Sequence, residues 1–327
     1  MSPKTLNLTG VVLLLAVALW SPTSHAATVE EGLAALNAQN YGEAIKILRP
    51  LADGGDPQAQ YFVGTMYRDG KGLPQDQKVS CEWFEKSAEQ GPPPAMHMTG
   101  LCYRLGLPGA VDNAKAAFWL KKAVERGYVP SMCVLGDLYA TGSGVEKSPE
   151  RTFELCQQSA KAGDPGAQYK LGLLYMSGFG TEQNPTQAAN WVGTAAITGD
   201  AAAQLTLGEF YWNGFGLEQD RNKAYVLFKA SGDQGFGPAL LHVGKLLLNE
   251  AQSLDGSMDG TKIASAYVWL TLADINAANA ANREEAKSLA DRIRPALQKE
   301  ILDEAQGIVD AWRPKPPQTQ LIKPAAP

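Results

Sequence analysis

The sequence predicts an all-α, right-handed α-solenoid of helix-turn-helix repeats with a 36-residue period and a helical cap at each end. The first observation is a glycine that recurs every 36 positions, at residues 64, 100, 136, 172, 208 and 244. The second is a set of columns that keep this offset: tyrosine at 67, 103, 139, 175 and 211, and glycine at 70, 106, 142, 178 and 214 and at 91, 127, 163, 199 and 235. The third is helical spacing of small and apolar residues, which occurs twice in each unit. Self-similarity of this kind indicates units that bury their apolar faces only against their neighbours.

The first 26 residues are typical of a cleavable export signal. Lys4 gives the charged start, Val11–Trp20 the apolar stretch, and Ser24–Ala26 the small-x-small cleavage site before Ala27. An apolar run of about 10 residues is too short for a bilayer, which needs about 20. No cysteine follows the cut to carry a lipid, and no later stretch is long and apolar enough to span a membrane. The sequence therefore predicts a periplasmic or secreted protein.

Residues 27–55 are expected to form a tetratricopeptide-like helical cap, a hairpin with Asn40-Tyr41-Gly42 at its centre. Residues 56–235 then hold five full repeats. In the first and fourth repeats, Asp56-Pro57 and Asp164-Pro165 provide a helix N-cap and a first-turn proline. The G-x-G pairs end the first helix and turn the chain, and the glycine column at 91 to 235 ends the second helix.

The chain after the fifth repeat departs from the period. Residues 236–281 form a degenerate last repeat with an insertion of about six residues, because the equivalent of Ala224 is Ala266 and not residue 260. Residues 282–312 are charged and amphipathic, with Pro295 starting a second helix, which suits a terminal cap with a polar outer face. Residues 313–327 are proline-rich and expected to be disordered.

The four cysteines can form disulfides if the chain is exported, because that compartment is oxidising. Cys81 and Cys102 are nearly equidistant from the turn at 91–94, as Cys133 and Cys156 are from the turn at 142–147. Antiparallel helices would place the two cysteines of each pair side by side, which predicts the bridges Cys81–Cys102 and Cys133–Cys156. The alternative is four small core residues, since free cysteine is usually buried.

The repeat resembles the Sel1-like repeat family, the tetratricopeptide relatives whose unit reads approximately A-x-x-x-L-G-x-x-Y-x-x-G-x-G-V, a short loop, then K-A-x-x-W-x-x-K-A-A-x-x-G. Residues 167–180, AQYKLGLLYMSGFG, match it closely, and the resemblance covers about residues 56 to 275. Departures are Val63 in place of leucine, Pro108 in place of a turn glycine, and Leu247 in place of the tyrosine. The resemblance implies a binding module, since relatives act as envelope scaffolds, as regulators of membrane-bound sensors, and as immunity proteins against phospholipase effectors of type VI secretion.

Residues with catalytic chemistry are scarce, and we expect no enzyme, cofactor or metal. After removal of the signal only His97 and His242 remain, far apart and each in an ordinary helix column, so packing or surface positions are favoured over a triad or zinc site. The motifs S-x-x-K, G-x-S-x-G, H-E-x-x-H and C-x-x-C are absent. Residues 255–260 imitate the start of an EF-hand, but position twelve is Ala266 and not glutamate, which favours a surface turn.

The first helices of a solenoid usually line its concave face, where positions that differ between repeats are free to contact a partner. We name the following set the variable face; it combines large apolar anchors with charges, as interaction hot spots do. Its members are Phe62, Arg68, Met98, Leu101, Arg104, Asp137, Lys170, Leu173, Met176, Glu209, Trp212, His242 and Lys245. The alternative is that some of these side chains pack between adjacent first helices.

These observations predict a non-catalytic periplasmic adaptor or inhibitor, with an immunity protein among the roles, that holds a partner protein in its concave groove. The alternative of the same class is an envelope scaffold or sensor regulator. Alternatives of other classes are a cell-wall-acting or β-lactamase-like enzyme, and a peptidoglycan-binding module that stacks sugars on Trp212. A net charge of −5 without a basic run excludes a phosphate-backbone footprint, so nucleic acid is not an expected partner. The sequence leaves the oligomeric state open and favours a monomer.

Overall fold

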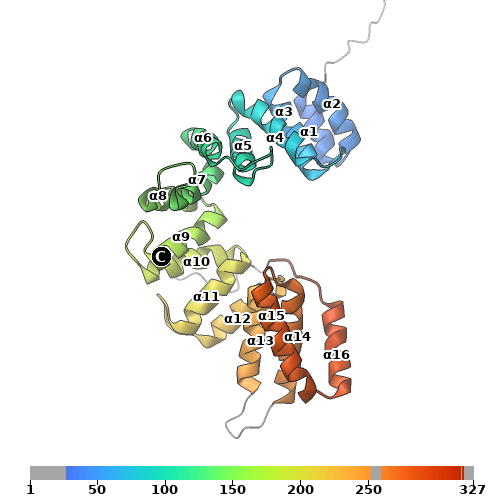
Figure 1. The fold of residues 1–327 in the computed structure, drawn as a ribbon, viewed down its shortest axis with the longest axis vertical. Coiled ribbons are helices and arrows are strands. Elements are labelled where there is room, and N and C mark those ends of the chain that lie inside the picture. The colour runs from blue at the N-terminus through green and yellow to red at the C-terminus, as the bar shows by residue number, and fades with distance from the viewer. Residues whose placement is uncertain (1–26, 252–258, 318, 320–327) are drawn as a thin grey trace, which may run out of the picture.

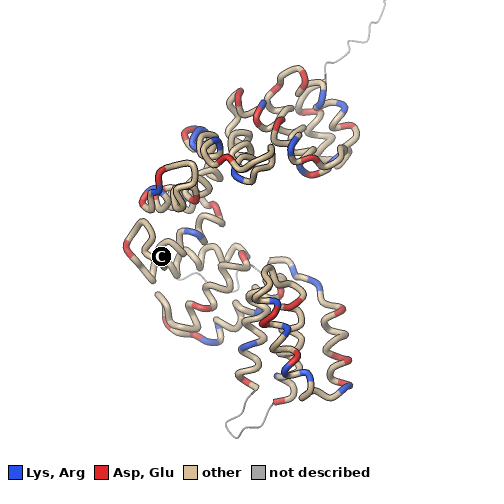
Figure 2. Tube along the Cα trace, in the orientation of Figure 1, with Lys and Arg blue, Asp and Glu red and all other residues tan. Residues whose placement is uncertain are grey.

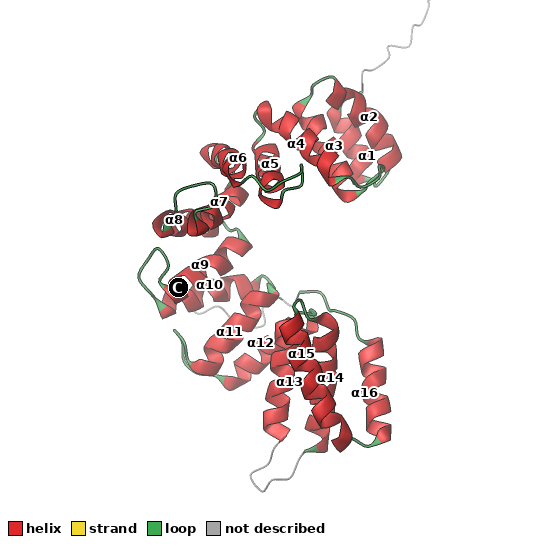
Figure 3. Cartoon of the chain, viewed as in Figure 1, coloured by secondary structure: helices red, strands yellow, loops and turns green. Residues whose placement is uncertain are grey.

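The computed structural model describes residues 27–251, 259–317 and 319. In that part of the chain every regular element is helical and there is no strand, as Figure 3 shows. The export signal at 1–26, most of the EF-hand-like loop and the end of the tail lie outside the described residues. The helices are α1 (Val29–Asn37), α2 (Tyr41–Asp53), α3 (Pro57–Asp69), α4 (Gln77–Glu89), α5 (Pro93–Leu105), α6 (Asn113–Glu125), α7 (Val129–Thr141), α8 (Pro149–Lys161), α9 (Pro165–Ser177), α10 (Pro185–Ile197), α11 (Ala201–Asn213), α12 (Arg221–Asp233), α13 (Gly237–Ala251), α14 (Gly260–Asn276), α15 (Ala280–Ile293), the 3₁₀ turn η1 (Arg294–Ala296) and α16 (Lys299–Ala311).

The helices of the repeats begin where the sequence predicts. The Asp56 carboxylate accepts a hydrogen bond from the Ala59 amide at 2.8 Å, and Pro57 occupies the first turn of α3. Asp164 caps α9 in the same way. Each cap satisfies an amide that the helix itself leaves without a partner. Each of the ten helices from α3 to α12 runs for 13 residues, including α5 and α7, which have no side-chain cap.

The first glycine of each turn adopts the left-handed backbone conformation and ends the first helix. Gly178, for example, has φ +69° and its amide donates to the Leu174 carbonyl. A side chain would strain this backbone, so glycine is favoured here. The prediction that the glycine pairs terminate the first helices is confirmed.

The core lies between the first and second helices of each repeat. The helices approach most closely at the glycine column at 64 to 244; a Cβ on Gly208 would meet the Phe228 ring at 2.5 Å. Ser80 donates from its hydroxyl to the Gly64 carbonyl at 2.8 Å, and Thr152 donates likewise to the Gly136 carbonyl at 3.0 Å. Small residues at these positions therefore bring the two layers together.

The described array curves along its length, with the hairpin α1–α2 at one end and helices α13 to α16 at the other (Figure 1). In this view α5 and α7 lie on the inner side of the bend, and α6 and α8 on the outer side. Basic and acidic residues are interspersed along the array, without a long stretch of one sign (Figure 2).

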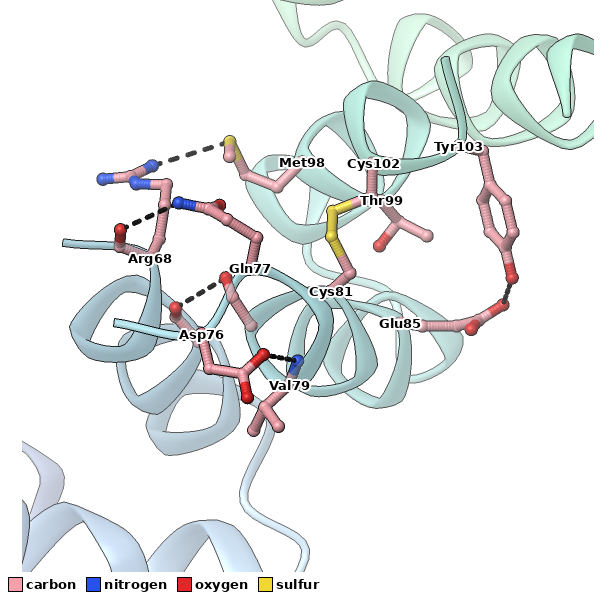
Figure 4. The surroundings of a disulfide bond; sticks show 12 residues. Arg68, Asp76, Gln77, Val79, Cys81, Glu85, Met98, Thr99, Cys102 and Tyr103 are labelled. Atoms are coloured by element: carbon pink, nitrogen blue, oxygen red, sulfur yellow. Dashed lines mark hydrogen bonds between the residues drawn. A yellow bond between two sulfur atoms is a disulfide. The ribbon is translucent and has the colours of Figure 1, made fainter. Parts of the chain in front are cut away.

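Two disulfides join the cysteine pairs that the sequence analysis expects. Cys81 of α4 is bonded to Cys102 of α5, with Cα atoms 5.9 Å apart, and Cys133 of α7 is bonded to Cys156 of α8, with Cα atoms 4.3 Å apart. The first bond, drawn in Figure 4, crosses from one repeat to the next, whereas the second lies within a repeat.

Two details near the C-terminus differ from the sequence prediction. Pro295 lies in the turn η1, and the following helix starts only at Lys299. Residues 313–317, predicted to belong to a disordered tail, contact the end of α12, where the Lys315 amide donates to the Asp233 carbonyl at 2.8 Å. The second difference arises from a tertiary contact that local composition does not report.

Candidate partner-binding face

The variable face runs along α3, α5, α7, α9, α11 and α13. Where a helix carries more than one member, the members are three or six residues apart, so they share one side of it. Twelve of the thirteen residues are half-buried and Lys245 is exposed; none is fully enclosed.

The apolar members of the variable face are partly buried in the core and partly accessible. Phe62, Met98 and Met176 pack against buried clusters of their own or neighbouring repeats. The Trp212 ring centroid lies 6.4 Å from that of buried Phe228. Because these side chains remain partly accessible, each presents an anchored apolar surface that loses little conformational entropy on contact with a partner.

Two contacts connect neighbouring first helices across the face. A guanidinium nitrogen of Arg68 lies 3.9 Å from the Met98 sulfur (Figure 4). The same guanidinium pairs with Asp69 at 2.7 Å. The Lys170 ammonium lies 2.9 Å from the Asp137 carboxylate. These contacts bridge neighbouring first helices at the surface of the face.

Two half-buried charges of the face have no counter-ion among the described residues. Arg104 on α5 and Glu209 on α11 make no ion pair and no hydrogen bond through their side chains in that part of the chain. Burial raises the pKa of the Glu209 carboxyl above its ordinary value. A charge that is partly desolvated and unpaired gains from a partner that supplies the opposite charge.

The end of the face near α13 is partly engaged by the protein itself. The His242 ring lies 4.2 Å from the Phe228 ring, and its Nε2 is buried without a hydrogen bond among the described residues. Burial, with a smaller contribution from Lys245, lowers the His242 pKa. The Lys245 ammonium pairs with Glu285 of α15 at 2.6 Å.

His97 lies on α5 beside the face and is half-buried, in keeping with a packing role. Its Nδ1 lies 2.9 Å from the Ser131 hydroxyl of α7, and burial lowers its pKa.

Two recesses are formed by residues outside the variable face, and sequence analysis did not identify them. One, of about 800 Å³, lies between α6, α7 and α8, where Lys121 and Arg151 stand 5.6 and 5.7 Å from the centroid of the Tyr139 ring. The other, of about 440 Å³, is a more apolar groove between α14 and α16. In sequence both linings are mixtures of polar and apolar residues, which resemble ordinary surface composition.

In the part of the chain that the structure describes, no group of three or more His, Cys, Asp and Glu side chains is placed to hold a metal ion. The Asp259 carboxylate, at the end of the EF-hand-like sequence, caps α14 by accepting from the amides of Thr261 and Lys262. Over the same described ranges, no helix combines the length and the apolar character needed to cross a membrane.

Solved structures with a similar fold include repeat proteins of bacteria. A Sel1 repeat protein from Oxalobacter formigenes is 25% identical with a TM-score of 0.67, over 76% of this chain and 97% of that one. A protective antigen with the SLR fold from uropathogenic Escherichia coli is 26% identical with a TM-score of 0.64, over 86% of this chain and 63% of that one. An immunity protein from Pseudomonas aeruginosa is 21% identical with a TM-score of 0.41, over 75% of this chain and 82% of that one, a likeness too weak to support a functional argument. No curated protein matches the sequence.

The Sel1 repeat pattern matches five consecutive segments, residues 57–92, 93–128, 129–164, 165–198 and 201–236, which together make up more than half of the chain. Sel1 repeats mediate protein–protein interaction, and the two-layered array of paired helices is the framework on which they do so. This chain belongs to the Sel1 repeat family.

Proposed function

We propose that the chain is a non-catalytic adaptor or inhibitor of the bacterial envelope that binds a partner protein on the variable face. The observation that carries the proposal is the pair of half-buried, uncompensated charges at Arg104 and Glu209, set among apolar side chains that are anchored in the core. Aromatic and arginine anchors of this kind dominate the energetics of protein interfaces. The unpaired carboxylate calls for a cation on the partner, and the unpaired guanidinium for an anion.

The envelope location rests on the signal-like residues 1–26 together with the two disulfides, which persist in oxidising compartments. Fractionation of cells expressing the full chain tests it, with mass spectrometry of the mature N-terminus. We expect a periplasmic product that begins at Ala27. An intact N-terminus in the cytoplasmic fraction would remove this part of the proposal.

The partner face is tested by site-specific photocrosslinking in cells. A crosslinker at Leu101 or Leu173, both on the variable face, should capture a discrete partner band. The matched controls are Phe118 and Val226, apolar residues of the second helices that are 49% and 44% exposed. Crosslinks at the control positions alone, or at none of the four, would contradict the assignment of the face.

The charged anchors are then tested on the captured partner. Arg104→Glu and Glu209→Lys should each weaken binding by tenfold or more, about 1.4 kcal/mol, since each places a like charge opposite the partner group. Lys223→Glu, at an exposed residue of α12, is the control for a charge change elsewhere and should leave the affinity unchanged.

The specific form that we propose is an immunity protein that neutralises a phospholipase effector of type VI secretion. It is supported by the proposed export, because a toxin that acts on the envelope has to be met in that compartment. The purified chain should inhibit a lipase encoded beside it at near-stoichiometric ratio, and Glu209→Lys should relieve the inhibition. Full lipase activity at saturating wild-type chain would exclude this role and leave that of an adaptor.

A further inference from the structure

The proline-rich segment that follows α16 runs back across the array instead of leaving it. The Lys315 amide donates to the Asp233 carbonyl at 2.8 Å, and the Lys315 ammonium lies 3.0 Å from the Asp233 carboxylate. Farther along, Pro317 and Thr319 lie against Gly199, which follows α10. In Figure 1, α16 and α10 stand on opposite sides of the last repeats, so the segment crosses from one to the other.

Two prolines of this segment contact equivalent glycines of successive repeats. Pro314 lies against Gly235 and Pro317 against Gly199, so three residues of the tail correspond to one repeat of 36 residues. Proline restricts both itself and the residue before it to extended backbone. An extended polyproline segment rises about 9 Å in its three-residue turn, and packed helices are spaced by about 8 to 10 Å. A Pro-x-x-Pro segment therefore meets successive repeats with the same face.

The proline rings lie against the glycine column at 91 to 235, which ends the second helices. We call each of these glycine positions a seat. Its members have positive φ, which accounts for glycine in every repeat, and the missing side chain leaves room at the surface. A Cβ on Gly199 would lie 2.7 Å from the Pro317 Cβ, and one on Gly235 would lie 3.4 Å from the Pro314 ring. Gly91 is covered by Arg126, which donates to its carbonyl at 2.7 Å. Gly127 and Gly163 have no atom within 4 Å of such a Cβ among the described residues.

The seat at Gly235 differs from the others because a buried, doubly paired carboxylate, that of Asp233, lies beside it. Its side chain is only 7% exposed and receives two ammonium groups, from Lys229 and Lys315, both at 3.0 Å. The equivalent residues of the earlier repeats are Glu89, Glu125, Lys161 and Ile197. A buried carboxylate needs cationic partners, and here one of the two comes from the tail.

We propose that Asp233, Gly235 and Gly199 form a binding site for an extended Pro-x-x-Pro segment that carries a lysine between its prolines. The resident ligand is the chain's own Pro314–Pro317, and a segment of the same chemistry on a partner protein exchanges with it. The site lies at the ends of the second helices and is separate from the variable face. The proposal therefore does not depend on the function proposed above.

The test uses the full chain with its tail released. Lys315→Glu with Pro317→Gly places a carboxylate against Asp233 and removes one ring, while the sequence of the array is unchanged. A fluorescent peptide of residues 311–319 is titrated into both proteins and followed by anisotropy. We expect at least about tenfold tighter binding to the released variant, because the tethered tail competes at a millimolar effective concentration. Equal binding to both proteins, or to neither at millimolar concentration, would overturn the proposal.

Two controls identify the site and the resident ligand. Asp233→Asn in the released background should weaken peptide binding, as should Lys315→Glu in the peptide; an unchanged affinity in either case would place the peptide elsewhere. Hydrogen exchange of the Lys315 amide should be slower in the wild type than after Asp233→Asn. A wild-type dimer that forms with rising concentration and is lost with Lys315→Glu would show a tail exchanged between copies, and would overturn the intramolecular assignment.

Discussion

The second glycine of each G-x-G turn offers a sharp test of how neighbouring repeats are held together. Gly180 has φ +72°, and an added Cβ would come within 3.0 Å of the carbonyl oxygen and carbon of Pro149, at the start of α8 in the preceding repeat. Gly127 has nearly the same φ, +75°, with no atom within 4 Å of the added Cβ. Gly127→Ala therefore measures the cost of backbone conformation alone, about 1 to 2 kcal/mol. Gly180→Ala adds overpacking against backbone, about 1 to 3 kcal/mol, for a total of about 2 to 5 kcal/mol.

Urea unfolding followed by circular dichroism measures both free energies of unfolding under the same conditions. We also expect a broader transition for Gly180→Ala, because coupling between neighbours sustains cooperativity in a repeat array. If the free energies of unfolding of the two variants agree to within about 0.5 kcal/mol, the turn does not pack tightly against the preceding repeat and the reasoning is refuted. The result bears on binding, since this contact helps to set the spacing of the first helices that carry the variable face.

Three further outcomes are expected. Cys81→Ser with Cys102→Ser should lower the free energy of unfolding by about 3 kcal/mol, since the bond closes a loop of 21 residues; a non-reducing urea midpoint equal to that of the wild type would contradict this. Burial lowers the His242 pKa in the folded state, so its contribution to stability is present above the unfolded value and lost as the pH falls. His242→Phe should therefore flatten the decline of the free energy of unfolding between pH 7.5 and 5.5, by at most about 1.4 kcal/mol per pH unit, and an unaltered slope would exclude the effect. A double-mutant cycle on Asp137 and Lys170 should give a coupling of about 0.5 kcal/mol that decreases with salt, because both side chains are more than a third exposed; a coupling above 2 kcal/mol would indicate a far less solvated pair.

Features set by local chemistry could be predicted from the sequence. The Asp56 cap, the left-handed Gly178 and the two-helix unit follow from neighbouring residues, and the repetition of each signal removes chance matches. The cysteine pairs could be expected for the same reason, because hairpin symmetry places each pair at one level. The 36-residue period thus supplies information that a single unit would not.

Features set by contacts between distant residues could not be predicted. Lys315 is 82 residues from Asp233, and its segment has the composition of a disordered tail until the glycine seats are placed in space. Column membership likewise gives the side of a helix but not its exposure. Lys170 is half-buried, whereas Thr206, in the same column of the next repeat, is only 9% exposed and hydrogen-bonds to Tyr169 at 3.0 Å.

The Cys81–Cys102 bond lies at the joint where, among the five full repeats, the turn lacks the second glycine. At the other joints this glycine seats against the start of the preceding second helix or of α2, as at Gly72, Gly144, Gly180 and Gly216. In the second repeat the equivalent residue is Pro108, which cannot adopt the positive φ of that seat. The disulfide crosses between repeats at this joint, from α4 to α5. The covalent bond therefore adds a restraint at the joint that lacks the glycine contact, near the part of the variable face where Met98 lies beside Arg68.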